Sequence, residues 1–110
     1  MNVDRETIAN ARVLMVGAGG IGCELLKTLV LHGFRDITAI DLDTIDVSNL
    51  NRQFLFRRAD VGKSKAEVAA RQIQKMVPTC KVVGKIGNIK DPLYGTEFFR
   101  EFDLIFNALD

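Results

Sequence analysis

The chain has 110 residues, of which 47% are hydrophobic and 26% charged, and its net charge is +1. This length supports one domain or part of a larger one. The balanced charge argues against a broad nucleic-acid-binding surface, and the apolar runs are shorter than the roughly 20 residues that a membrane span needs. Because the polar N-terminus lacks the apolar core of a secretory signal, we expect an intracellular protein without nucleic-acid or membrane partners.

Residues 3–11 are expected to form a short lead-in helix or arm. The apolar run from Val13 to Val16 is typical of a strand buried on both faces of a parallel sheet. It leads into Gly17-x-Gly19-x-x-Gly22 and an amphipathic helix that ends near residues 32 and 33. In this setting the glycines permit a tight turn, close approach to a phosphate and close packing of helix on strand. The free amides at the helix start favour an anion, so the sequence predicts a nucleotide site.

A second strand is expected at residues 37–40, ending at Asp41, which lies 24 residues after Gly17 (41 minus 17). This spacing is close to the ~20 residues expected for the acid that accepts hydrogen bonds from a ribose. Asp43 is near enough to assist at the nucleotide. In the following polar segment, residues 48–56, a short helix would anchor Leu50 and Phe54 on one face.

A third helix is expected from Ser64, which forms a capping box with Glu67, to Pro78. Lys63 and Lys65 then lie at a helix N-terminus, where positive charge is disfavoured by about 0.3–1 kcal/mol. Two interpretations remain open: a bound polyphosphate reverses this effect, or both lysines extend into water.

A third strand at residues 81–86 leads to Asn88 and Ile89. A short helix within residues 90–102 carries Tyr94 and three phenylalanines, which we expect in a core or interface. A fourth strand is expected at residues 104–109. The sequence thus predicts an α/β fold: a Rossmann-like, doubly wound, mainly parallel sheet with helices on both faces, with residues 1–110 as the N-terminal part of a nucleotide-binding domain.

Parallel sheets bind ligands beyond the carboxyl ends of their strands, where the glycine loop, Asp41, Asn88 and Asp110 should meet. Arg52 and Lys65 are expected to reach the same edge. A phosphate cradle with two cations and a carboxylate able to hold Mg²⁺ suits attack on a nucleoside triphosphate. A nicotinamide-dependent oxidoreductase, which needs no such cations, is the alternative enzyme, and a non-catalytic scaffold subunit is a third hypothesis.

Two stretches resemble the ubiquitin-like modifier activating enzymes (the E1 family). They read Gly-Ala-Gly-Gly-Ile-Gly-Cys-Glu-Leu-Leu-Lys at residues 17–27 and Ile-Asp-Leu-Asp-Thr-Ile-Asp-Val-Ser-Asn-Leu-Asn-Arg-Gln-Phe-Leu-Phe at residues 40–56. Within the family, residues 62–69 and 97–110 are most similar to the SUMO-activating catalytic subunits, and the NEDD8-activating catalytic subunits are the second choice.

The resemblance implies ATP-dependent adenylation of a modifier's C-terminal carboxylate, followed by thioester transfer in a longer protein. It implies that Asp41 holds the ribose, that Arg52 and Lys65 neutralise phosphates as catalytic residues, and that Asp110 coordinates Mg²⁺. The nucleotide-binding residues that it implies, with Asp43 added from the loop, are Gly17, Ala18, Gly19, Gly20, Ile21, Gly22, Asp41, Asp43, Asn49, Leu50, Asn51, Arg52, Lys65, Asn88 and Ile89. Position 88 is asparagine, whereas the family is expected to have serine there. We therefore expect contacts of the nucleotide with the backbone of this residue.

The resemblance also implies a second E1 subunit, a partner E2 conjugating enzyme, and a location in the nucleus and cytoplasm. The thioester cysteine and any Zn²⁺-binding C-x-x-C pairs are expected beyond Asp110. Cys23 and Cys80 show no metal-ligand spacing and are interpreted as non-catalytic, Cys23 as a small buried residue beside a glycine. We expect the isolated fragment to bind ATP weakly and to form no thioester.

Overall fold

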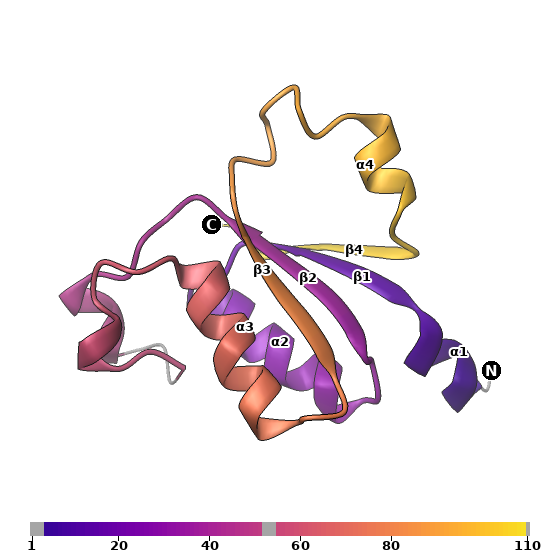
Figure 1. Cartoon of the computed structure of the whole chain (residues 1–110), viewed down its shortest axis with the longest axis horizontal. Coiled ribbons are helices and arrows are strands. Elements are labelled where there is room, and N and C mark those ends of the chain that lie inside the picture. Colours follow the sequence, from indigo (N-terminus) through magenta and orange to yellow (C-terminus); the bar gives the residue numbers. More distant parts are fainter. Residues whose placement is uncertain (1–3, 52–54, 110) are drawn as a thin grey trace.

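The computed structural model describes residues 4–51 and 55–109. Helices and strands alternate along the chain (Figure 1). In order they are α1 (Arg5–Asn10), β1 (Arg12–Val16), α2 (Gly20–Leu31), β2 (Asp36–Asp41), the 3-10 helices η1 (Val47–Asn51) and η2 (Arg58–Asp60), α3 (Lys65–Met76), β3 (Lys81–Ile86), α4 (Thr96–Arg100) and β4 (Leu104–Asn107). Within this described part of the chain, no helix combines the length and apolar character needed to cross a membrane.

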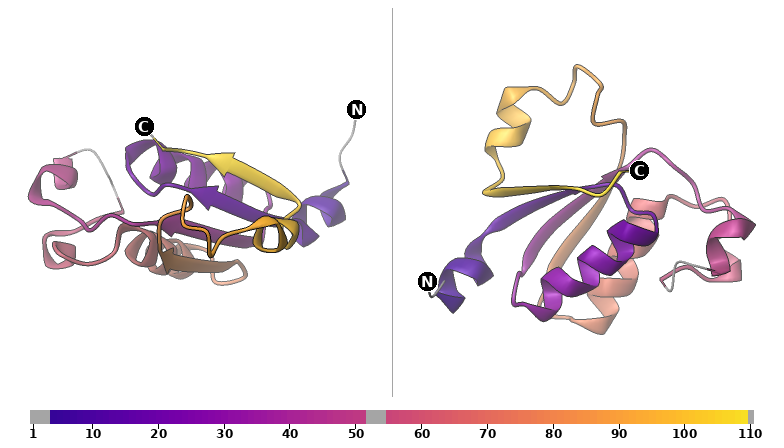
Figure 2. Two further views of the ribbon diagram at one scale, coloured as in Figure 1. Left: turned by 90° about the horizontal axis from the view of Figure 1, so that it is seen from above. Right: turned by 180° about the vertical axis from the view of Figure 1, so that it is seen from behind.

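The four strands form one parallel sheet in the order β3-β2-β1-β4. The helices α2 and α3 lie on one face of the sheet and α4 lies on the other, as Figures 1 and 2 show. The predicted doubly wound α/β fold is therefore confirmed. Because β1 is central, its carboxyl end, where the glycine loop begins, lies between those of β2 and β4.

Alternate residues of β1 serve two separate cores, as the two-residue period of a strand requires. Val13 and Met15 pack against α2 and α3, whereas Leu14 and Val16 face α4 together with Ile40. The α4 face is covered by half-buried side chains, namely Ile89, Tyr94, Phe98, Phe99 and Phe102. The expectation that these aromatic residues belong to a core is confirmed.

One expected boundary is wrong. The fourth strand was expected to reach residue 109 but ends at Asn107. The side-chain oxygen of Asn107 accepts a hydrogen bond from the Leu109 N–H at 3.0 Å. Such a local turn competes with ladder pairing. The Ala108 N–H still donates to the Val16 carbonyl at 2.7 Å, and the chain leaves the sheet after this bond.

Candidate functional site

A pocket of about 220 Å³ lies at the carboxyl edge of the sheet. It is formed by the β1–α2 loop, the end of β2, the start of α3 and the residues after β4. Its lining residues are Gly17, Gly19, Gly20, Ile21, Asp41, Asp43, Lys65, Ala108 and Leu109. The parallel sheet thus brings together segments that are far apart in the sequence.

The glycine loop is shaped by two close backbone approaches. Gly17 has a φ of +101°, and a Cβ there would lie 2.9 Å from the Ala108 carbonyl group. A Cβ on Gly22 would lie 2.5 Å from the carbonyl oxygen of Gly17, so α2 packs directly on the turn that precedes it. These distances give the physical reason for glycine at both positions.

The start of α2 lines the pocket with Gly19, Gly20 and Ile21. Its N-cap residue is Gly19, which has no side chain to cap the helix, and its first turn carries no acidic residue. By contrast, α1 is capped by the Asp4 carboxylate and α3 by the Ser64 hydroxyl. The amides of the first turn of a helix lack partners within the helix, so this end of α2 can bind an anion.

Asp41 holds two walls of the pocket together. The residue as a whole is 8% exposed. Its Oδ2 accepts a hydrogen bond from the Ala18 N–H at 2.7 Å, and its Oδ1 accepts one from the Asp43 N–H at 2.9 Å. A carboxylate oxygen has two acceptor sites, so the geometry leaves capacity for a ribose hydroxyl. Ribose binding stays a prediction, but the carboxylate has a structural task that the sequence reasoning missed.

The two lysines at the start of α3 differ in their surroundings. Lys65 lines the pocket with a side chain only 12% exposed, and its Nζ lies 3.9 Å from Oδ2 of Asp43, whose side chain is 69% exposed. The Lys63 side chain is 53% exposed and its Nζ lies 4.0 Å from Oδ1 of Asp60. The hypothesis that both lysines extend into water is therefore wrong for Lys65.

Lys65 is placed by a small antiparallel pairing between residues 43–45 and 62–65, which we call the clasp. Thr44 and Ser64 form a β-bridge. The Ile45 N–H donates to the Lys63 carbonyl at 2.8 Å, and the Gly62 N–H donates to the Ile45 carbonyl at 2.8 Å. The clasp fixes the start of α3 against the segment that follows β2.

Among the described residues, Leu50, Asn88 and Ile89 do not belong to the lining of this pocket. Leu50 is half-buried against the α2–α3 core, while Ile89 packs on the α4 face. Asn88 accepts a hydrogen bond from the Lys90 N–H at 3.0 Å. Asn49 and Asn51 belong to η1. Arg52, Phe54 and Asp110 lie outside the described residues, so their proposed roles stay predictions.

Ala108 and Leu109 line the pocket but were not predicted. The sequence could have indicated them. The fourth strand was expected, and its parallel pairing with β1 sets Asn107 opposite Val16. The residues after Asn107 must therefore lie beside Gly17. Sequence reasoning singled out Asp110 in this loop and passed over its neighbours, which contribute through their backbone rather than their side-chain chemistry.

Both cysteines are buried thiols. Cys23 donates a weak hydrogen bond to the Ala18 carbonyl at 3.5 Å, and burial raises the pKa of Cys23 to about 12 despite the nearby Lys65 ammonium. Burial also raises the pKa of Cys80. Because the thiolate is the nucleophilic form, the interpretation of both residues as non-catalytic is supported.

These raised pKa values predict unreactive thiols and a loss of stability at alkaline pH. Above pH ~8.5 the unfolded chain gives up thiol protons that the folded chain retains, so the free energy of unfolding should fall as the pH rises towards 12. We expect a disulfide reagent at pH 8 to label no cysteine in the native protein and both in denaturant. Urea unfolding gives the free energy of unfolding at pH 8 and at pH 10. We expect this free energy to fall less between the two pH values for Cys23→Ala than for the unaltered chain. Equal falls would contradict the raised pKa of Cys23.

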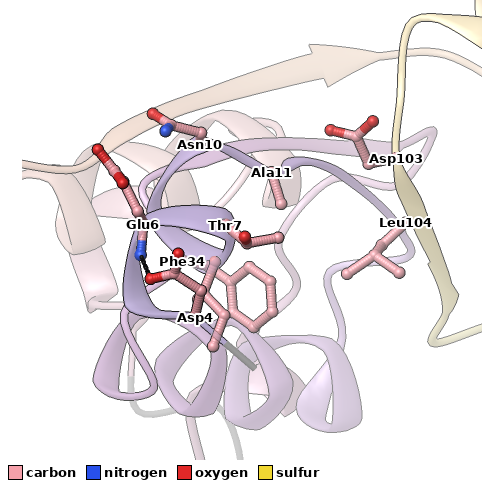
Figure 3. A pocket seen from close by; sticks show the side chains of 9 residues that line it. Asp4, Glu6, Thr7, Asn10, Ala11, Phe34, Asp103 and Leu104 are labelled. Carbon is pink, nitrogen blue, oxygen red and sulfur yellow. Dashed lines mark hydrogen bonds between the residues drawn. The ribbon is translucent and has the colours of Figure 1, made fainter. Parts of the chain in front are cut away.

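A larger pocket, about 810 Å³, lies at the opposite edge of the sheet, between α1 and the start of β4 (Figure 3). The ring of Phe34 lies between the α1 side chains and Leu104, while Asp4, Glu6 and Asp103 surround it with negative charge. Carboxylates repel phosphate groups, and none of the lining residues given for this pocket is cationic. The smaller pocket also contains Asp41 and Asp43, but the Lys65 ammonium and the start of α2 line it as well. It is therefore the candidate anion site.

Comparisons with known proteins identify the family of the chain. The model of the ThiF family matches residues 2–110. The chain is 53% identical over 105 residues to SUMO-activating enzyme subunit 2 of Dictyostelium discoideum, covering 96% of this chain and 16% of that protein. It is 58% identical over 105 residues to the NEDD8-activating enzyme E1 catalytic subunit of Caenorhabditis elegans, covering 96% of this chain and 24% of that one. The chain thus spans less than a quarter of these relatives.

Solved structures give the same fold. The crystal structure of Escherichia coli MccB with ATP has a TM-score of 0.73 and 39% sequence identity, covering 79% of this chain and 26% of that one. The MccB structure with AMPCPP and selenomethionine MccA has the same TM-score and identity, with 79% and 25% covered. These neighbours share the Rossmann-like arrangement described above.

Proposed function

Because the chain belongs to the ThiF family and its curated relatives are subunits of ubiquitin-like E1 enzymes, we propose that it supplies the ATP-binding pocket of an adenylating E1 enzyme. The substrate would be the C-terminal carboxylate of a ubiquitin-like modifier. The observation that carries the proposal is the Lys65 ammonium, which lines the same pocket as the uncapped start of α2.

In this reaction a carboxylate oxygen of the modifier attacks the α-phosphorus of ATP. The bond between that phosphorus and the oxygen bridging to the β-phosphate breaks, and pyrophosphate leaves with the electron pair. The product is an acyl adenylate. Fixed cations and amides that face the phosphate oxygens stabilise the developing charge. We assign this task to Lys65 and the first-turn amides of α2, and by proposal to Arg52.

The pocket fits a polyphosphate better than a neutral ligand. The Lys65 side chain is only 12% exposed. The free-energy cost of burying its charge is lowest when an anion lies beside it. The only carboxylate paired with it among the described residues is the largely solvated Asp43. A phosphate group entering the pocket would therefore find a cation with an incomplete set of partners.

Mg²⁺ is proposed as the accompanying metal, with Asp110 as its ligand. Mg²⁺ is commonly held by one or two carboxylates together with substrate phosphates, which matches an edge that offers Asp43 within the pocket. Bound there, the metal would neutralise phosphate charge. Zn²⁺ is proposed only for segments beyond this chain.

SUMO is our proposed modifier, with a second E1 subunit and an E2 conjugating enzyme as partners in the nucleus and cytoplasm. NEDD8 is the second candidate, favoured by the 58% identity to a NEDD8-activating subunit. Thioester formation by the full-length protein and its partner subunit, with SUMO and NEDD8 supplied separately, distinguishes the two.

Calorimetry with ATP·Mg²⁺ and with NAD tests nucleotide choice directly. We expect the chain to bind ATP more tightly, and Lys65→Met to weaken ATP binding at least about tenfold, the effect of losing a charge-assisted contact. Lys63→Met is the matched control and should leave ATP binding unchanged, because its side chain lies outside the pocket. Tighter binding of NAD would favour an oxidoreductase, and equal losses in both lysine variants would remove the assigned role of Lys65.

A further inference from the structure

We propose that Asp43 is an internal counter-anion for Lys65, and that it makes the pocket discriminate against polyphosphates that carry no divalent cation. The inference deepens the proposed function and rests on it, because it concerns which form of the nucleotide the pocket accepts. It assigns to Asp43 a role in specificity that differs from direct binding of the nucleotide.

The backbone of Asp43 is fixed on both sides. Its N–H donates to Asp41 Oδ1 at 2.9 Å, and its carbonyl accepts a hydrogen bond from the Lys65 N–H at 3.1 Å. Residues immediately after it enter the clasp through the bridge between Thr44 and Ser64. The position from which the carboxylate extends is therefore set by main-chain contacts and does not depend on its charge.

Among the described residues, the carboxylate itself is held by a long-range attraction to Lys65. The 3.9 Å between Lys65 Nζ and Asp43 Oδ2 exceeds the range of a hydrogen bond. The Asp43 side chain is 69% exposed, whereas that of Lys65 is 12% exposed and packed within the pocket. An anionic ligand that binds the Lys65 ammonium would thus displace the Asp43 carboxylate. The Asp43 side chain would rotate, and the Lys65 side chain would stay in place.

This displacement has a consequence for ligand choice. A phosphate beside Lys65 comes near a second negative charge on Asp43, and rotation moves that charge only a few ångströms. A divalent cation between the phosphate and the carboxylate turns this repulsion into attraction. Without the cation, a unit charge roughly 4–6 Å from the phosphate is expected to reduce affinity about tenfold in partly solvated surroundings.

The test is calorimetry of Asp43→Asn with ATP in the presence of a chelator and, separately, with excess Mg²⁺. The substitution keeps both main-chain hydrogen bonds and the approximate shape of the side chain. We expect metal-free ATP to bind the variant about tenfold more tightly than the unaltered chain, and the ratio to approach one with Mg²⁺. Asp46→Asn is the matched control, because it removes the same charge from the same loop outside the pocket lining.

The proposal is overturned if Asp43→Asn binds metal-free ATP no more tightly, or if Asp46→Asn gives the same gain. If the unaltered chain binds ATP·Mg²⁺ while these results fail, the proposed function stands and only this inference falls. If no variant binds ATP under either condition, both fall. Asp43→Ser serves as a second variant, and urea unfolding of each protein verifies that it is folded.

Discussion

Asp41→Asn is expected to lower the free energy of unfolding by about 3 kcal/mol, although it leaves the number of non-hydrogen atoms in the side chain unchanged. The carboxylate accepts one main-chain N–H at each oxygen, at 2.7 and 2.9 Å. In asparagine one of these oxygens becomes an NH₂ group, so a donor faces a donor in a buried site. Losing charge-assisted hydrogen bonds and leaving a buried N–H unsatisfied each cost about 1–3 kcal/mol.

Urea unfolding followed by circular dichroism measures this effect, with Asp103→Asn as the matched control. The Asp103 carboxylate also accepts a main-chain N–H, that of Arg12 at 2.8 Å, but it is exposed. Water can replace a lost partner there, so we expect a cost below about 1 kcal/mol. Similar losses in the two variants would show that burial of the Asp41 carboxylate contributes nothing.

Gly22→Ala is the second large effect, with an expected net loss of about 2 kcal/mol and loss of ATP binding. Alanine in a helix is intrinsically favoured over glycine by about 1 kcal/mol, so without a clash this substitution would stabilise the protein. The added Cβ would lie 2.5 Å from the Gly17 carbonyl oxygen. Gly17 is itself held by its N–H, which donates to the Ile40 carbonyl at 2.8 Å. The helix must therefore move, at a cost of about 1–3 kcal/mol or more.

Gly95→Ala is the control for Gly22→Ala, because the nearest atom to an added Cβ there is 3.9 Å away. Because alanine is less favourable than glycine at an N-cap, we expect a cost of about 0.5–1 kcal/mol there, with no contribution from a steric clash. Thermal or urea unfolding of both variants measures these changes in the free energy of unfolding. A Gly22→Ala protein as stable as the unaltered chain would mean that α2 does not need its close approach to the loop.

The sequence alone predicted the order and type of the helices and strands, because their signals are local. Val13 to Val16 is apolar throughout, Ser64 precedes a periodic stripe, and Pro78 follows its end. The parallel sheet follows from the alternation of strands and helices. With the sheet in place, the meeting of the glycine loop with Asp41 and Lys65 at one edge could be expected, and the pocket lining confirms it.

Lys65 was predicted to reach the nucleotide edge, but the local pattern gave no reason to prefer its burial over that of Lys63, since both precede or begin the same helix. The difference arises from the clasp, a pairing between residues about 20 positions apart that carries no strand-like pattern in either segment. The two hydrogen bonds of Asp41 were also not predicted, because they depend on how the Ala18 and Asp43 amides turn back towards one carboxylate. Contacts of Asn88 and Ile89 with a nucleotide base remain predictions.

The clasp also determines how Lys65 is anchored. The Thr44–Ser64 bridge closes the base of the segment that contains η1 and η2. The Lys65 N–H donates to the Asp43 carbonyl at 3.1 Å, so the backbone at the start of α3 is held directly by the opposite arm of the clasp. Lengthening an already closed loop adds only a slowly growing entropic cost. Small changes of length near Arg58 and Ala59 should therefore leave the start of α3 in place, whereas changes at Leu55 or Phe56 would disturb the core in which these side chains are buried.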